Sequence, residues 1–174
     1  MPFFISRDDI TTMKTDAIVN AGNRELRRGG GVCGAIFKAA GAEEMEKALQ
    51  GLGPIDTGDA VATPGFALPA RYVIHTAGPI YHGKKEEREL LASCYRNSLL
   101  LAEKMHLASI AFPLISSGIY GYPVEEAKQV ALDAILSFLE THDMTVYLVI
   151  LKERARKDMV YSRLSYFLKS HEDM

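Results

Sequence analysis

The segment DAIVNAGNRELRRGGGVCGAIFKAA, Asp16–Ala40, decides the fold, and a second segment, PLISSGIYGYP at Pro113–Pro123, repeats its design. Each runs from apolar residues typical of a buried strand, through a glycine-rich turn, into a helical segment. Such a turn leaves backbone N–H groups unpaired at the start of a helix, where the helix dipole also favours negative charge. Two turns of this kind in a small protein predict that the phosphates of one ligand are held between them.

Strand-like and helical segments alternate along the whole chain. Short apolar runs bounded by Gly, Pro or Asn predict strands, and apolar residues three or four apart predict helices. The predicted strands are Phe3–Arg7, Asp16–Asn20, Ala60–Thr63, Tyr72–Thr76, Ser109–Leu114 and Thr145–Leu151. The predicted helices are Gly31–Ala40, Glu43–Gln50, Glu86–Met105, Val124–Glu140 and Arg154–Lys169. The longest of these has an apolar face of Leu90, Leu91, Tyr95, Leu99 and Ala102.

This alternation predicts an α/β fold with a largely parallel sheet sandwiched by helices. In such sheets the ligand crevice lies beyond the carboxyl ends of the strands. Both glycine loops leave strands at that edge, so we expect them to converge there. Neither a repeat nor a linker interrupts the sequence, so residues 1–174 are predicted to form one domain.

The composition excludes several other classes of protein. The chain has 174 residues, of which 48% are hydrophobic, and a formal net charge of −2, which argues against an extended cationic groove for nucleic acid. Arg7, Asp8 and Asp9 stand where a signal peptide needs an apolar core, and no apolar run approaches the length of a membrane span. Two cysteines are too few for a disulfide framework. We therefore expect a soluble, cytoplasmic protein.

The first glycine loop offers several candidate ligand contacts. Gly29–Gly31 allow positive φ angles and a close approach of a bulky anion to the backbone, and Val32–Gly34 then offer N–H groups. A glycine-rich connection without a ligand is the alternative. Asn20 and Asn23 flank the loop, and an amide suits a pair of ribose hydroxyls. Asparagine is equally an ordinary turn or cap residue.

The second loop offers a matching set. The hydroxyls of Ser116 and Ser117 and the amides of Gly118–Tyr120 can contact phosphate, and the Tyr120 ring can lie against a sugar. A half-buried aromatic ring is the alternative for Tyr120. Near the amino terminus, the Asp9 carboxylate either accepts a hydrogen bond from an adenine amino group or caps a turn.

The remaining polar residues do not form a catalytic pattern. The five histidines show no metal spacing with either cysteine, so no metal is expected. His75 follows an apolar strand and is interpreted as a hydrogen-bonded core residue. The charged run from Lys152 to Lys157 reads as the solvated face of the last helix. The residues by themselves therefore predict a nucleotide-diphosphate site and no acid–base pair.

The chain resembles the macro domain family, in particular its MacroD-like branch. The resemblance covers essentially the whole sequence: DDIT at Asp8–Thr11, DAIVNAGN, GGGVCGAIFKAAG, TGDAVATPGFALP at Thr57–Pro69, YVIHTAGP at Tyr72–Pro79, IAFPLISSGIYGYP and the final apolar strand. It implies a three-layer α/β/α sandwich with a mixed, mostly parallel central sheet. It also implies binding of ADP-ribose, as ligand or product, with no other cofactor.

The resemblance assigns roles by position. Asp9 would accept from the adenine amino group, and the backbone of Ile10 would contact the ring. Asn20 and Asn23 would contact or position the distal ribose. The two sides of the diphosphate would be lined by Gly30, Gly31, Val32 and Cys33, and by Ser116, Ser117, Gly118, Ile119 and Tyr120, with Tyr120 beside the distal ribose.

Four residues depart from the family pattern. Hydrolytic members commonly carry aspartate and histidine where this chain has Cys33 and Phe37, and a thiol is a poor substitute for a carboxylate base. Cys33 is either a reactive thiol near a helix start or a small residue that fills a tight loop. Arg28 replaces a glycine and either adds a cation near the phosphates or points to solvent. Leu151 replaces an aromatic residue, which forgoes about 1 kcal/mol of stacking.

Two functions follow as alternatives. The first is hydrolysis of ADP-ribose derivatives, either mono-ADP-ribosylated targets or O-acetyl-ADP-ribose, with Asn23 and a bound water as the chemical groups. The second is a non-catalytic module that reads free or protein-linked ADP-ribose. A weaker third option, a regulator associated with RNA or poly-ADP-ribose, is not encouraged by the near-neutral charge. The expected partner is ADP-ribose or an ADP-ribosylated protein, with no membrane and no nucleic acid.

Overall fold

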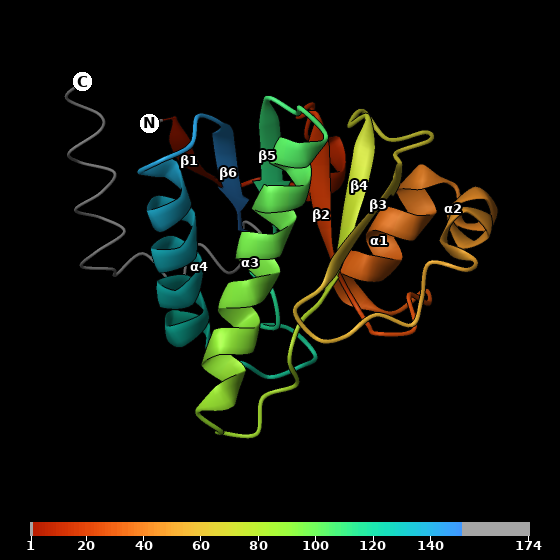
Figure 1. Ribbon diagram of the computed structural model, residues 1–174. Coiled ribbons are helices and arrows are strands. Elements are labelled where there is room, and N and C mark those ends of the chain that lie inside the picture. Colours follow the sequence, from red (N-terminus) through yellow and green to blue (C-terminus); the bar gives the residue numbers. More distant parts are fainter. Residues whose placement is uncertain (1, 151–174) are drawn as a thin grey trace.

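A mixed, mostly parallel sheet of six strands forms the centre of the computed structural model, which describes residues 2–150 (Figure 1). The strands are β1 (Phe3–Ser6), β2 (Ala17–Gly22), β3 (Ala60–Pro64), β4 (Tyr72–Ala77), β5 (Ser109–Phe112) and β6 (Thr145–Val149). Their order in the sheet is β1-β6-β5-β2-β4-β3. All neighbouring strands are parallel except β3, which is antiparallel to β4.

Helices cover both faces of this sheet. The helices are α1 (Gly31–Ala40), α2 (Ala42–Leu49), α3 (Glu86–Lys104) and α4 (Val124–Leu139), with a short 3₁₀ turn, η1, at Ile10–Thr12. The pair α3 and α4 packs side by side in front of the sheet in Figure 1. Buried residues of α1 and α2 belong to a separate core cluster on the other face. The predicted three-layer α/β/α arrangement is confirmed.

The strand β2 shows how the sequence directs this layering. Ala17 and Val19 pack in the core beneath α3 and α4, whereas Ile18, between them, packs beneath α1. Successive side chains of a strand point to opposite faces, so a continuous apolar run serves a sheet that is covered on both sides.

Most predicted elements appear within one or two residues of their expected bounds. The strand β5 ends at Phe112, before Pro113, which has no N–H group to extend the sheet. On α3, Leu91, Tyr95, Leu99 and Ala102 form the buried face as predicted. Leu90 was wrongly included in that face. The buried helical stripe runs through positions 91, 95, 99 and 102, so Leu90 lies beside it and is 36% exposed. The predicted helix Arg154–Lys169 and the residue Leu151 lie outside the described residues.

The chain path creates a crevice between the ends of two central strands. From β2 the chain continues to β3 and β4 on one side, and then crosses over through α3 to β5 on the other side. Parallel sheets with such a reversal place their ligand crevice at the carboxyl ends of the diverging strands. The β2 and β5 strands therefore locate a site where the two glycine loops leave the sheet.

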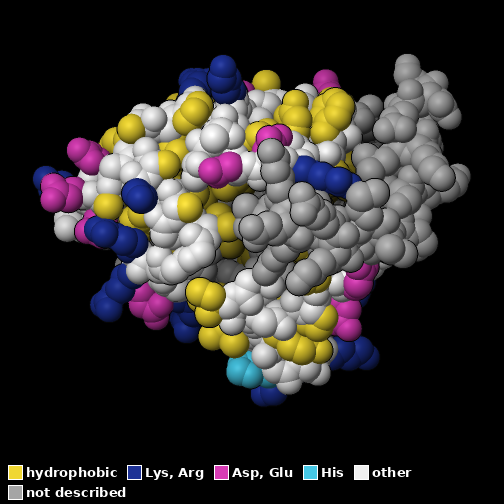
Figure 2. Space-filling view, turned by 180° about the vertical axis from the view of Figure 1, so that it is seen from behind, with side chains coloured by type: hydrophobic (Ala, Val, Ile, Leu, Met, Phe, Trp, Pro, Cys, Tyr) yellow, Lys and Arg dark blue, Asp and Glu magenta, His cyan; other side chains and the backbone are white. Residues whose placement is uncertain are grey.

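The surface carries charges of both signs. On the face shown in Figure 2, Lys and Arg side chains lie among Asp and Glu side chains, and hydrophobic side chains occur in small groups. Within residues 2–150, no helix has both the length and the apolar character that a membrane crossing requires.

Candidate functional site

A pocket of about 280 Å³ opens at the carboxyl ends of β2, β4, β5 and β6. The pocket residues predicted from the sequence are Asn23, Gly30, Gly31, Val32, Cys33, Ser116, Ser117, Gly118, Ile119 and Tyr120. The others are Ala21, Gly22, Gly29, Gly78, Pro113, Leu114, Ile115, Val149 and Ile150. The structure therefore brings the two glycine loops together around one cavity.

The first loop presents the start of α1 to the pocket. Gly31 has a φ of 57°, in the region that favours glycine, and a Cβ added there would meet no atom within 4 Å. The first helical hydrogen bond runs from Gly34 N to Gly30 O, so the N–H groups of Gly31, Val32 and Cys33 precede it. Gly34 was wrongly counted among the free donors, because its N–H group is engaged in that bond.

Asn23 organises the first loop as well as lining the pocket. Its Oδ1 accepts a hydrogen bond from Arg27 N at 2.9 Å, and its Nδ2 donates to Arg27 O at 3.0 Å. This ring encloses Leu26, which is buried and has a φ of 57°. A side-chain amide has two donor hydrogens and two acceptor lone pairs, so these two bonds leave capacity for a ligand.

Cys33 and Arg28 are both engaged within the protein. The Cys33 thiol, 6% exposed, lies between Asn20 Nδ2 at 3.6 Å and Arg27 O at 3.8 Å, an arrangement that fits a small residue filling a tight loop. Arg28 forms an exposed ion pair with Glu46 of α2 at 2.6 Å and is not among the residues that line the pocket.

A row of buried polar side chains crosses three strands beneath α1. Asn20 Nδ2 lies 3.1 Å from His75 Nδ1, and His75 Nε2 lies 2.9 Å from Thr63 Oγ1. Burial lowers the pKa of His75 to about 4, so the ring is neutral at physiological pH. The interpretation of His75 as a hydrogen-bonded core residue is confirmed. Asn20 lies behind Cys33, and its Oδ1 has no hydrogen-bond partner among residues 2–150.

The second loop is a series of tight turns. Ser116 has a φ of 66°, and its carbonyl accepts from Tyr122 N at 2.9 Å. Gly121 N donates to Gly118 O at 3.0 Å, which folds the loop tip back on itself. Ile119 at this tip is 82% exposed, and a Cβ added to Gly30 would lie 3.3 Å from its Cδ1. The tips of the two loops therefore meet at Gly30 and Ile119.

The second loop rests on α3 and on the end of β4. The buried Tyr95 hydroxyl of α3 accepts from Ile115 N at 3.0 Å and donates to Pro113 O at 3.3 Å. A Cβ added to Gly78 would lie 2.3 Å from Ser116 Oγ and 2.8 Å from Ile115 Cγ2, so a larger residue would force these side chains to shift. Sequence reasoning missed Gly78, although a glycine directly after a buried strand is the pattern that a close approach produces.

The described residues that line the pocket carry no charged side chains. Among the lining residues within 2–150 there is no Asp, Glu, His, Lys or Arg. Burial raises the pKa of the Tyr120 phenol, with smaller contributions from Glu25 and Cys33, so its hydroxyl stays protonated and can donate. Within the described residues, an anionic ligand would therefore be held by backbone N–H groups, the helix dipole and hydroxyls.

Asp9 and Ile10 lie outside the pocket lining. The Asp9 carboxylate accepts from Thr11 N at 2.9 Å and from Thr11 Oγ1 at 2.7 Å, which caps η1. Ile10 is buried in the core cluster of α1. Asp9 thus performs the capping role, and contact of both residues with adenine stays a prediction. Within the described part of the chain, no group of three His, Cys, Asp or Glu side chains is arranged to hold a metal.

Comparison with known proteins identifies the family. A Macro domain family model matches residues 19–131. A macro domain-containing protein of Chlorobaculum tepidum is 55% identical over 132 residues, which cover 75% of this chain and 76% of that protein. An O-acetyl-ADP-ribose deacetylase of Salmonella typhimurium is 45% identical over 166 residues, which cover 92% of each protein. The chain belongs to the macro domain family.

Solved structures share the fold. The Oceanobacillus iheyensis macrodomain with ADP has a TM-score of 0.85 and 40% identity, and the alignment covers 95% of this chain and 91% of that one. The Trypanosoma brucei macrodomain in complex with ADP-ribose has a TM-score of 0.80 and 40% identity, with 89% of this chain and 66% of that one covered.

Proposed function

We propose that the pocket binds ADP-ribose, with the diphosphate between the two glycine loops. The observation that carries this proposal is the facing pair of loops, which offer backbone N–H groups and hydroxyls around one cavity. Structures of relatives with ADP and with ADP-ribose support the choice of ligand. Preorganised N–H groups at a helix start bind phosphate without a formal positive charge.

The proposed orientation of the ligand follows from the site residues. We place the distal ribose beside Asn23 and Tyr120, and the adenine toward Asp9 and Ile10. The Asn23 amide retains one hydrogen and one lone pair beyond its bonds to Arg27, enough to pair with a ribose hydroxyl. Asn20 lies behind Cys33, so it would support the part of the pocket wall next to the distal ribose without contacting the ribose.

We further propose that the protein processes ADP-ribose derivatives, with removal of an acetyl group from O-acetyl-ADP-ribose as the leading reaction. The relatives that carry the name O-acetyl-ADP-ribose deacetylase support this choice. A water would add to the acetyl carbonyl, and cleavage of the bond to the ribose oxygen would give acetate and ADP-ribose. The protonated Tyr120 hydroxyl and the Asn23 amide would donate to the oxygens that gain negative charge.

A non-catalytic reader of ADP-ribose is the second candidate. The observation that favours it is that no carboxylate or imidazole lines the pocket within residues 2–150, so no ordinary general base stands beside the ribose. In that case the pocket would recognise ADP-ribose, free or attached to a protein, without turnover.

Turnover assays separate the two functions. The protein is incubated with O-acetyl-ADP-ribose, ADP-ribose 1″-phosphate and a mono-ADP-ribosylated protein, and products are resolved by chromatography. Release of ADP-ribose, slowed in Tyr120→Phe but with little change in KM, supports processing. Binding of ADP-ribose without release of product from any substrate would support the reader. We expect this activity in the cytoplasm, with an ADP-ribosylated protein as the macromolecular partner.

A further inference from the structure

The connection between β4 and α3 lies against the second loop at Tyr120. Tyr81 N donates to Tyr120 O at 2.9 Å, and the rings of Tyr81 and Tyr122 lie 5.0 Å apart with an interplanar angle of 59°. Tyr122 in turn donates its N–H to Ser116 O. Tyr81 is therefore coupled to the second loop at two points, once through the Tyr120 backbone and once through the Tyr122 ring.

A single buried carboxylate holds this connection in place. Glu87, in the first turn of α3, is 6% exposed. Its two oxygens accept from His82 N, both at 2.9 Å, and one of them accepts from Lys84 N at 2.8 Å. Burial alone would raise the pKa of Glu87, but the hydrogen bonds from these backbone N–H groups lower it, so the carboxylate is ionised at neutral pH.

The carboxylate does more than begin a helix. The first backbone bonds of α3 already run from Glu87 N to Lys84 O and from Arg88 N to Lys85 O. The Glu87 side chain instead reaches the His82 and Lys84 N–H groups of the preceding connection, one and three residues beyond Tyr81. Charge-assisted bonds to backbone N–H groups are among the stronger hydrogen bonds of proteins, so this contact restrains the segment.

We propose that Glu87 is a positioning residue for the ligand site: it fixes His82 and Lys84, these fix Tyr81, and the Tyr81 N–H holds the Tyr120 carbonyl where the distal ribose binds. The inference rests on the proposed binding of ADP-ribose. It assigns a role in ligand recognition to a residue that does not line the pocket. The effect is expected at the distal ribose, because the Tyr81 N–H group is bonded to the Tyr120 carbonyl.

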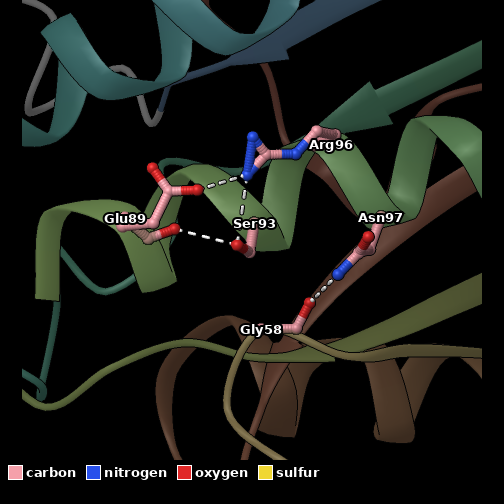
Figure 3. Close-up of polar contacts among 5 residues, drawn as sticks. All are labelled: Gly58, Glu89, Ser93, Arg96 and Asn97. Carbon is pink, nitrogen blue, oxygen red and sulfur yellow. Dashed lines mark hydrogen bonds and ion pairs between the residues drawn. The ribbon is translucent and has the colours of Figure 1, made fainter. Parts of the chain in front are cut away.

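The test compares Glu87→Gln with a matched control on the same helix. Gln keeps the shape of the side chain but removes the charge and turns a donor toward the backbone N–H groups. Glu89→Gln is the control, because Glu89 forms an ion pair with Arg96 at 2.6 Å on a surface of α3 (Figure 3), where its side chain is 73% exposed. On the same surface, Ser93 Oγ donates to Glu89 O and Asn97 Nδ2 donates to Gly58 O. None of these residues is among those that line the pocket.

Calorimetric titration with ADP-ribose and with ADP gives the main readout. We expect Glu87→Gln to lose about tenfold in affinity for ADP-ribose, the value of one well-made hydrogen bond. Its affinity for ADP, which lacks the distal ribose, should stay unchanged, and Glu89→Gln should bind both ligands as wild type does. Hydrogen exchange at Tyr81 N–H should accelerate only in Glu87→Gln.

Other outcomes overturn the proposal in distinguishable ways. Equal losses for ADP-ribose and ADP would make Glu87 a merely structural residue, and unchanged affinity for both would remove its link to the site. If wild type does not bind ADP-ribose, the proposed function fails and this inference fails with it. If the Gln variant does not fold, Glu87→Asp, which keeps the charge but shortens the reach by one methylene, is judged by the same criteria.

Discussion

Replacing Gly31 by glutamate tests the phosphate cradle directly. The Cβ of the new side chain would meet no atom within 4 Å, so the carboxylate can extend into the pocket that Gly31 lines. The φ of 57° imposes backbone strain on any residue other than glycine, about 1–2 kcal/mol of unfolding free energy. The variant should therefore fold, with a modestly lower Tm.

The loss of ADP-ribose affinity should come mainly from charge. A carboxylate about 5 Å from a phosphate, at an effective dielectric constant of about 20, is repelled by roughly 3 kcal/mol. That energy corresponds to a loss of somewhat more than a hundredfold in affinity. Gly31→Gln is the matched control, because it carries the same backbone strain and nearly the same volume without the charge.

Calorimetric titration of both variants with ADP-ribose, at low and high salt, measures this difference. We expect the Glu variant to bind at least a hundredfold more weakly than the Gln variant, and added salt to narrow the gap because it screens the repulsion. Equal affinities of the two variants would refute the placement of the diphosphate beside Gly31.

Three further predictions follow from individual contacts. Gly78→Ala places a Cβ 2.3 Å from Ser116 Oγ and 2.8 Å from Ile115 Cγ2, so urea unfolding should show a loss of about 1–3 kcal/mol, together with weaker ADP-ribose binding; unchanged stability would contradict the close approach. His75 has a pKa of about 4 when folded and 6.5 when unfolded, so the unfolded state binds more protons between these values and stability falls as pH falls through this range. Between pH 7 and pH 4.5 the protonation of His75 should lower the unfolding free energy of the wild-type protein by about 2–3 kcal/mol, and His75→Gln should not show this fall. An equal dependence of unfolding free energy on pH in wild type and variant would rule out this role of His75. Cys33→Asp should raise the rate of O-acetyl-ADP-ribose hydrolysis by about a hundredfold, if a missing base limits the reaction, and a rate no higher than wild type would show that the site works differently.

Local patterns predicted the fold well. Apolar runs marked all six strands, because a sheet covered on both faces needs residues such as Ala17, Ile18 and Val19. The glycine loops were recognised because positive φ at Gly31 and helix starts after strands are local properties of the chain. Leu90 was misplaced because adjacent leucines leave the helical stripe ambiguous until the helix is packed.

Contacts between distant segments could not be read from the sequence. A side chain at Gly78 would collide with Ser116 and Ile115, which approach it from the end of another strand. The Tyr95 hydroxyl of α3 bonds to Pro113 and Ile115 of the second loop, and no local sequence pattern predicts this contact. The pairing of Arg28 with Glu46 likewise depends on how α2 packs against the first loop.

The most direct test of the account is a calorimetric titration of the wild-type protein with ADP-ribose, beside ADP and AMP. The account predicts saturable binding of one ADP-ribose per chain, weaker binding of ADP, which lacks the distal ribose, and the weakest binding of AMP, which also lacks the diphosphate. Absence of binding by ADP-ribose, or equal affinity for all three nucleotides, would contradict the claim that the two loops hold its diphosphate and ribose.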